Sequence, residues 1–212
     1  MPRRDTGRGL RRRRPVRDPL PLILVVCEGE VTEPQYIKQF KQAHGVTTVN
    51  VHVVSPGGDP QALVEEAIEL RTKADRAARR TRDMNAAYDE VWCVIDVDEH
   101  ERLPEAQQLA ARNQIRLAIS NPSFELWLLL HFAAQTGHLT RTQATVRLRR
   151  HLPRYDKHLP YDEVRHGYLE AVRRAQALDK HHEEVGSVGG NPSTGVHVLA
   201  ERIREYSRAA RL

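Results

Sequence analysis

Acidic residues follow two apolar runs of the sequence, at the point where each run ends. Leu22–Cys27 is unbroken and apolar and is followed by Glu28, and Val91–Ile95 is followed by Asp96 and Asp98. Because side chains alternate along an extended backbone, Asp96 and Asp98 can point to the same side. Ligands of open α/β sheets bind at the carboxyl ends of the strands. A neighbouring strand that ends at Glu28 would therefore add a third carboxylate to this pair.

Three converging carboxylates need a compensating charge. Without nearby lysine or arginine they repel one another and raise at least one pKa, unless a divalent cation is bound. Oxygen-only ligands suit Mg²⁺ or Mn²⁺, with waters and substrate phosphates completing the shell. Such an ion would activate water and stabilise the charge on a scissile phosphate. We expect Glu28, Asp96 and Asp98 to be metal ligands and catalytic residues, although acids at strand ends also serve as helix caps or turn residues.

Five further polar residues are candidates for supporting roles. Glu30 and Glu33 lie beside the first carboxylate and are placed to add a metal or water-mediated contact, although Glu33 is also favourable simply as a residue of a helix first turn. Asn121 follows the fourth expected strand at the same sheet edge. Glu125 lies one helical turn further on, where a buried carboxylate needs a partner. It is either a supporting acid of the site or hydrogen-bonded to backbone or an arginine. His100 is placed to shuttle a proton or contact a phosphate.

The elements that position these residues are strands that alternate with helices. Four strands are expected, at Leu22–Cys27, Val49–Ser55, Val91–Ile95 and Ile115–Ile119. Helices are expected after Thr32, which is placed to cap the first of them, after Asp59, at Pro104–Asn113 and at Phe124–Phe132. The last of these is apolar nearly all round, so we expect it to be buried between layers. This alternation predicts an α/β fold with a mainly parallel sheet and helices on both faces.

The pattern changes near Thr140, after which only helices are expected. They span Thr140–Leu152, Asp162–His181 and Val196–Ala210. The glycine-rich segment before the last helix lacks the spacing of a phosphate-binding P-loop, so no nucleotide is assigned to it. We expect three parts: a basic tail over residues 1–18, an α/β core over residues 19–135, and a helical appendage over residues 136–212 that packs on the core.

The net charge of the chain comes from its first residues. The 212 residues hold 33 Lys and Arg against 28 Asp and Glu, a net charge of +5. Residues 1–18 hold eight arginines and two aspartates, which leaves 25 basic and 26 acidic residues elsewhere. Such a tail cannot bury enough apolar surface to order itself, and we expect it to be disordered when free. It either contacts nucleic-acid phosphates or acts as a solubilising leader. The contacting residues would be Arg11, Arg12, Arg13 and Arg14.

Other features exclude several classes of protein. No stretch approaches the roughly 18 consecutive apolar residues of a membrane span, and the N-terminus lacks the apolar run of a signal peptide. The two cysteines, Cys27 and Cys93, form no CxxC pair that would hold zinc. We therefore expect a cytoplasmic protein without a membrane partner. A second basic stretch, Arg147–His158, is placed to guide a nucleic-acid backbone, although surface helices often have this composition.

Four motifs resemble those of the RloB family, and the resemblance spans nearly the whole chain after the tail. They are VCEGE at Val26–Glu30 with Thr32-Glu33-Pro34 after it, IDVD at Ile95–Asp98, SNPSFELW at Ser120–Trp127, and NPST at Asn191–Thr194. RloB-like proteins are bacterial and are often encoded in restriction and abortive-infection loci that defend against phage. Their core looks like a Toprim domain, a metal-dependent phosphoryl-transfer fold. By this resemblance, Glu28 matches the Toprim glutamate, and Asp96 and Asp98 match its DxD pair.

The resemblance also implies an activity and a partner. A chain of 212 residues leaves no room for the tyrosine domain of a topoisomerase or the synthetic domain of a primase. A Mg²⁺-dependent nuclease that acts on DNA or RNA in anti-phage defence remains as the simplest activity. Toprim-like defence nucleases commonly act beside a separately encoded ABC or SMC-like ATPase, so such a partner is expected. The alternative is a non-catalytic sensor or regulatory subunit that docks on the ATPase. A homo-oligomer is compatible with either.

Overall fold

The computed structural model describes residues 21–53, 59–97, 103–187 and 189–209. The expected basic tail with its four candidate arginines lies outside the described residues, as do Asp98 and His100. Within the described part of the chain, no helix is long and apolar enough to cross a membrane.

The centre of the fold is a five-stranded sheet in the order β2-β1-β3-β4-β5. Its parallel strands are β1 (Ile23–Cys27), β2 (Val49–Val53), β3 (Glu90–Asp96) and β4 (Arg116–Asn121), and the antiparallel edge strand is β5 (Ser193–Thr194). The interior strands β1 and β3 are almost entirely buried, as strands covered on both faces must be. The expectation of an α/β fold with a mainly parallel sheet is therefore confirmed.

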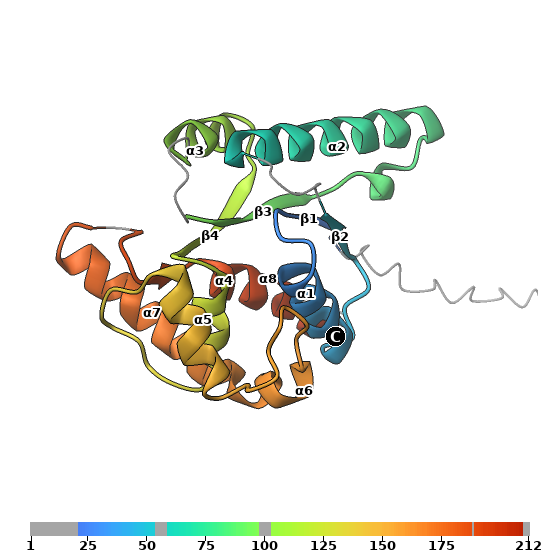
Figure 1. Ribbon diagram of the computed structural model, residues 1–212. Coiled ribbons are helices and arrows are strands. Elements are labelled where there is room, and N and C mark those ends of the chain that lie inside the picture. Colours follow the sequence, from blue (N-terminus) through green and yellow to red (C-terminus); the bar gives the residue numbers. More distant parts are fainter. Residues whose placement is uncertain (1–20, 54–58, 98–102, 188, 210–212) are drawn as a thin grey trace, which may run out of the picture.

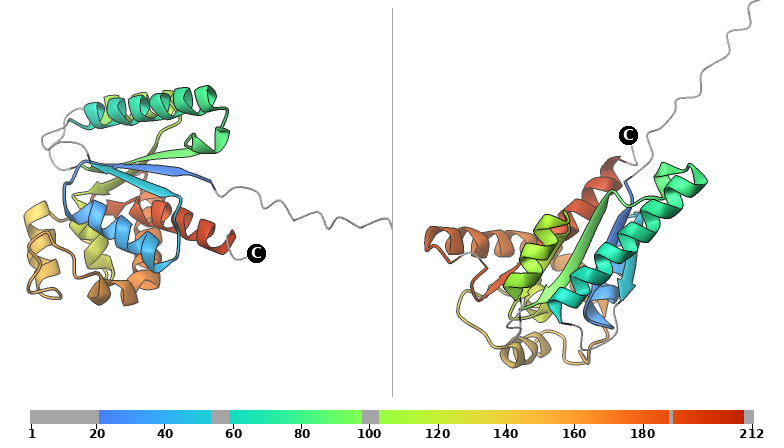
Figure 2. Two further views of the ribbon diagram at one scale, coloured as in Figure 1. Left: turned by 90° about the vertical axis from the view of Figure 1, so that its right-hand side faces the viewer. Right: turned by 90° about the horizontal axis from the view of Figure 1, so that it is seen from above.

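Helices cover both faces of this sheet (Figures 1 and 2). One face carries α2 (Pro60–Thr81) and α3 (Leu103–Arg112), and the other carries α1 (Thr32–Ala43), α4 (Phe124–Leu130) and α8 (Val196–Ala209). The remaining helices α5 (Arg141–Arg149), α6 (Tyr161–Val164) and α7 (Tyr168–Glu184) extend the second layer. Alternate side chains of β1 enter the two cores, because Val25 faces the larger one and Val26 the smaller.

The strand order places a switch point between β1 and β3. The chain leaves β1 through α1 on one face of the sheet and reaches β3 through α2 on the other face. In doubly wound sheets of this order, the crevice at the carboxyl ends of these two strands is the usual ligand site. Glu28 directly follows β1 and Asp96 ends β3, so the fold brings both to this crevice.

The helix α4 is the buried centre of the larger core, as its apolar sequence predicts. All seven of its residues are buried, among them the carboxylate-bearing Glu125. Trp127 and Phe124 pack edge-on against Tyr36 of α1. This packing fixes the start of α4, and therefore the backbone that contacts the end of β3.

The C-terminal part differs in two ways from the helices expected there. The short strand β5 pairs with the end of β4, through Ser120 with Thr194 and Asn121 with Ser193. The expected helix at Asp162–His181 is interrupted by a 3₁₀ turn at Arg165–Gly167. A side chain at Gly167 would come within 2.1 Å of the carbonyl oxygen of His131, so this turn packs directly on backbone. The expectation of helices alone after Thr140 was wrong at β5.

Candidate active site

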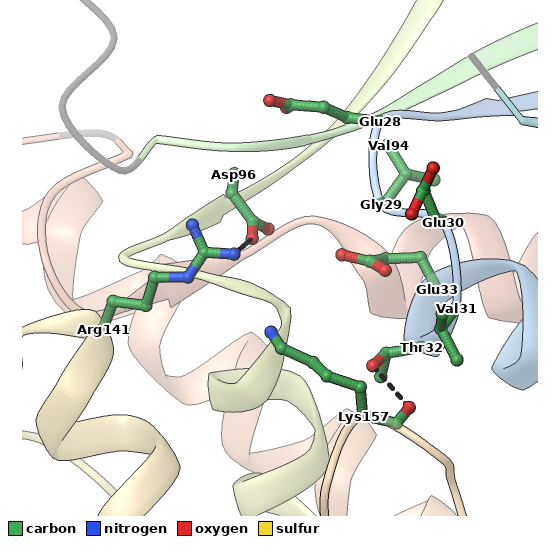
Figure 3. Close-up of a pocket in the computed structure, with 10 residues that line it drawn as sticks. All are labelled: Glu28, Gly29, Glu30, Val31, Thr32, Glu33, Val94, Asp96, Arg141 and Lys157. Carbon is green, nitrogen blue, oxygen red and sulfur yellow. Dashed lines mark hydrogen bonds and ion pairs between the residues drawn. The ribbon is translucent and has the colours of Figure 1, made fainter. Parts of the chain in front are cut away.

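A cavity of about 290 Å³ opens at the carboxyl ends of β1 and β3. Its walls come from the loop after β1, the start of α1, the end of β3, the start of α5 and the loop that follows α5 (Figure 3). The lining residues are Glu28, Gly29, Glu30, Val31, Thr32, Glu33, Val94, Asp96, Arg141 and Lys157. Four carboxylates and two cationic side chains therefore share one small cavity.

In the loop after β1, the side chain of Glu33 folds back over the backbone of Gly29. A side chain at Gly29 would lie 2.0 Å from Oε2 of Glu33, so the carboxylate of Glu33 rests directly on the glycine. Only glycine leaves room for this approach. The glycine of the VCEGE motif is thus explained by the position of a carboxylate four residues later, which points into the cavity (Figure 3).

Thr32 ties this loop to the C-terminal part of the chain. The expected capping role was wrong, because Val31 occupies the cap position and no side chain caps α1. The Thr32 hydroxyl instead donates to the carbonyl oxygen of Lys157 at 2.8 Å and lies 3.1 Å from the hydroxyl of Tyr155. These bonds join the two walls of the cavity.

Asp96 is a buried carboxylate at the base of the cavity. Its Oδ1 accepts a hydrogen bond from the backbone N–H of Phe124 at 2.9 Å, and its Oδ2 lies 3.7 Å from the guanidinium of Arg141. Burial raises the pKa of Asp96 well above its usual value, and repulsion from Glu33, Glu125 and Glu28 raises it further, against the attraction of Arg141. An ionised Asp96 is therefore costly in the metal-free protein.

Glu33 faces Asp96 across the cavity (Figure 3). It is buried, and burial is the main reason that its pKa is raised; the charge of Glu125 acts in the same direction, while Lys157 and Arg141 act against it. In the same view, the Glu28 side chain runs along the sheet edge above Asp96, and Glu30 lies at the exposed rim. The cavity thus holds four carboxylates against the two cations Arg141 and Lys157.

Glu125 lies beneath the cavity and is fully hydrogen-bonded. It accepts bonds from Ser123 Oγ at 2.6 Å, Lys157 Nζ at 2.9 Å and the hydroxyl of Tyr155 at 3.2 Å. Burial opposes its ionisation, but the bonds from Ser123 and Lys157 outweigh burial and lower the pKa of Glu125. The sequence left open either a supporting acid of the site or a hydrogen bond to backbone or an arginine. The structure shows hydrogen bonds from a lysine and two hydroxyls. Glu125 does not line the cavity itself, but it holds the ammonium of Lys157, which does.

The two cations of the cavity were not identified as site residues from the sequence. Arg141 begins α5, and Lys157 lies in the loop after it, far along the chain from both acidic motifs. Lys157 has φ of +88°, a left-handed conformation that is costly for a residue with a side chain. Its carbonyl is held by Thr32 and its ammonium by Glu125. The one feature of the sequence that pointed to Lys157 was its position in the basic stretch Arg147–His158.

Asn121, which the sequence offered as a supporting site residue, does not line the cavity. Its side chain accepts a bond from Asn191 Nδ2 at 3.0 Å and donates to the carbonyl oxygen of Gly189 at 3.1 Å. Asn191 also bonds both backbone polar groups of Leu139. The two Asn-Pro motifs therefore hold β4, β5 and the segment before α5 together. The Asn121 side chain therefore ties the end of β4 to the C-terminal segment and does not line the cavity.

A divalent cation suits the chemistry of the described donors. Glu28, Glu33 and Asp96 offer only oxygen ligands. Burial raises the pKa of Asp96, and repulsion from Glu33, Glu125 and Glu28 raises it further. No group of three or more His, Cys, Asp or Glu side chains close enough to hold a metal is found among the residues that the structure describes. The expected third ligand, Asp98, lies outside those residues.

Comparison with curated proteins and with solved structures finds no match. A family model described as RloB-like protein matches residues 23–203, which includes every strand of the sheet and both walls of the cavity. The chain therefore belongs to the RloB-like protein family.

Proposed function

We propose that this chain hydrolyses phosphodiester bonds of DNA or RNA with the help of Mg²⁺ or Mn²⁺ bound in the carboxylate cavity. The observation that carries the proposal is the buried Asp96, which shares the cavity at the switch point of the sheet with three further carboxylates and has the guanidinium of Arg141 3.7 Å from its Oδ2. A structural ion-pair cluster would balance its charges, whereas this cavity holds more acids than bases.

The residues that would hold the divalent ion are Glu28, Asp96 and Asp98. When bound, the ion would lower the pKa of water and neutralise charge on the scissile phosphate. This assignment rests on oxygen-only donors, on the excess of acidic over basic side chains in the cavity, and on the resemblance of these positions to the motif of the Toprim fold.

The chain's own residues have three tasks in this proposal. The backbone N–H of Phe124 fixes the orientation of Asp96. The Arg141 side chain, 42% exposed, is placed to bind a phosphate oxygen at the cavity wall. The Glu33 carboxylate points into the cavity, and burial raises its pKa, so it is placed to exchange a proton with a bound substrate.

The biological setting is a proposal that rests on the family resemblance. We infer that the activity serves defence against phage and that a separately encoded ABC or SMC-like ATPase acts with the chain. The alternative, a non-catalytic sensor or regulatory subunit docked on that ATPase, makes the opposite prediction for the acidic residues, because loss of their charge would then leave the assembly's activity unchanged.

The test is cleavage of end-labelled DNA and RNA by the purified chain, with Mg²⁺, Mn²⁺ or chelator, and with or without the neighbouring ATPase. Asp96→Asn and Glu28→Gln should abolish metal-dependent cleavage. Asp162→Asn is the matched control, because the Asp162 side chain is 90% exposed and, within the described part of the chain, its ion pair is with Arg165. Cleavage that persists in Asp96→Asn, or that is equally lost in Asp162→Asn, contradicts the proposal.

A further inference from the structure

A second cavity, of about 350 Å³, opens beside the carboxylate cavity. Its walls come from the residue after β3, the end of β4 with Pro122, the first turn of α5 with the segment before it, and Asn191. Because both Asn-Pro motifs contribute to it, it is called the Asn-Pro cavity here. Arg141 lines both cavities, and Val97 of the second directly follows Asp96 of the first. The two cavities therefore share the wall to which Arg141 belongs.

Side-chain hydrogen bonds hold the walls of the Asn-Pro cavity in place. Asn191 accepts from the backbone N–H of Leu139 at 2.8 Å and donates to the carbonyl oxygen of Leu139 at 2.7 Å and to Asn121 Oδ1 at 3.0 Å. At the start of α5, the hydroxyl of Thr140 accepts from the N–H of Gln143 at 3.2 Å, and the Gln143 side chain accepts from the N–H of Thr140 at 2.9 Å. The cavity is therefore preformed, which lowers the cost of ordering a ligand in it.

The two cavities differ in charge. The carboxylate cavity holds four acidic side chains, whereas among the described residues that line the Asn-Pro cavity none is acidic and two, Arg141 and His138, are basic. His138 and Thr142 are exposed, so both are accessible to a ligand. A nucleic-acid strand carries a negative charge at every phosphate. Its phosphates outside the metal site therefore fit the Asn-Pro cavity better than the acidic one.

The size of the carboxylate cavity limits what it can hold. At about 290 Å³, it is no larger than the smallest sites for drug-sized ligands, which start at about 300 Å³. A hydrated ion and the scissile phosphate would fill it, so the adjoining sugar and base must lie outside. Arg141 extends from α5 toward Asp96 (Figure 3), and a phosphate bound to this guanidinium would lie at the wall that the two cavities share.

We propose that the Asn-Pro cavity binds the nucleotide next to the scissile phosphate, an inference that rests on the proposed nucleic-acid substrate. Val97 and Pro122 supply apolar surface for the sugar and base. Arg141 and His138 supply donors for phosphate oxygens, and a guanidinium suits a phosphate because it binds through two parallel hydrogen bonds. The cavity would thus orient the strand so that the scissile phosphate faces the carboxylates.

The experiment measures binding of the full chain to short labelled single strands of DNA and of RNA, in chelator and over a salt series. The variant Thr142→Glu places a negative charge at the Asn-Pro cavity, and an acid in the first turn of α5 is favourable for the helix dipole, so the fold is kept. Strand affinity at low salt should fall by about fivefold or more, because a like charge a few ångströms from a phosphate costs at least this factor. The loss should shrink as salt rises.

The matched control is Gln143→Glu, which adds the same charge in the same turn at an exposed residue that does not line the Asn-Pro cavity. Glutamate at this position keeps the capping box with Thr140. The inference requires a clearly larger loss of strand affinity in Thr142→Glu than in this control, and equal affinities of the two variants contradict it. Unchanged strand binding by Thr142→Glu, combined with lost binding of a free nucleoside monophosphate, also contradicts it and assigns the cavity to a free nucleotide.

The same measurement separates this inference from the nuclease proposal, because no step of it requires cleavage. Selective loss of strand binding in Thr142→Glu supports the Asn-Pro cavity as a nucleotide site even when the wild type cleaves nothing, a result that would refute only the nuclease proposal. Metal-dependent cleavage by the wild type, with equal strand affinity in Thr142→Glu and Gln143→Glu, would refute only the inference.

Discussion

The substitution Asp96→Asn should stabilise the metal-free protein at neutral and basic pH. Asparagine keeps the shape of the side chain, and its Oδ1 still accepts the bond from the N–H of Phe124. What it removes is a buried charge that other carboxylates repel. When a divalent ion is present, the same substitution should lower the stability of the folded protein relative to the wild type, because it removes a metal ligand.

The raised pKa of Asp96 gives the sign of the change in stability. One pKa unit corresponds to about 1.4 kcal/mol, and the pKa lies well above its usual value. The raised pKa already includes the attraction of Arg141, which opposes burial and the other carboxylates but does not cancel them. A net gain of about 1 kcal/mol would raise the Tm of a chain of this length by about 2–4 °C.

The raised pKa of Asp96 fixes how the stability difference between the two proteins changes with pH. Below the unfolded pKa of about 3.9, Asp96 is neutral in both states and the substitution changes little. As pH rises through the raised folded pKa, the wild-type chain loses stability that the variant keeps. The difference in Tm should therefore grow from about pH 4 upward and then level off.

The assay is thermal unfolding of both proteins over this pH range, with chelator and with Mg²⁺. An ion bound only by the folded wild type adds about 2.7 kcal/mol at one hundred times its Kd, so Mg²⁺ should reverse the order of the two Tm values at about pH 8. A variant that is less stable than the wild type at every pH, in chelator as well, would refute the reasoning and make Asp96 a structural partner of Arg141.

Three further outcomes are expected. Gly29→Ala should displace the Glu33 carboxylate from the loop, since a Cβ would lie 2.0 Å from it; metal-dependent cleavage should fall while Tm changes by only a few degrees. Lys157→Met should leave the buried Glu125 without its cation, at a cost of about 1–3 kcal/mol in urea unfolding, and an unchanged midpoint would mean that the two hydroxyls suffice. Deletion of residues 1–17 should weaken binding to all sequences alike and flatten the salt dependence, whereas parallel salt series of equal affinity would assign the tail another role.

The central strands and the acidic positions were predictable from local pattern. An unbroken apolar run bounded by turn residues indicates a strand buried on both faces, as in β1 and β3. Because parallel strands end at one edge, the positions of Glu28 and Asp96 followed from the same pattern. The buried α4 followed from its apolar sequence.

What the sequence missed depends on long-range contacts. Arg141 and Lys157 reach the cavity only because the C-terminal part folds back over the sheet, and no local spacing records that. The strand β5 has two residues within a glycine-rich segment, too short for an alternating pattern. The break between α6 and α7 arises from backbone packing of Gly167 on His131. Thr32 has the residue type of a cap, yet its hydroxyl bonds Tyr155 and Lys157 instead.

The most direct measurement for the central claim is a titration of Mn²⁺ into the full chain at about pH 8, followed by calorimetry or by the electron paramagnetic resonance of the free ion. Saturable binding is predicted for the wild type and for the exposed control Asp162→Asn, and its loss is predicted for Asp96→Asn and Glu28→Gln. Equal binding by all four proteins, or none by the wild type, would contradict a divalent-metal site in the carboxylate cavity.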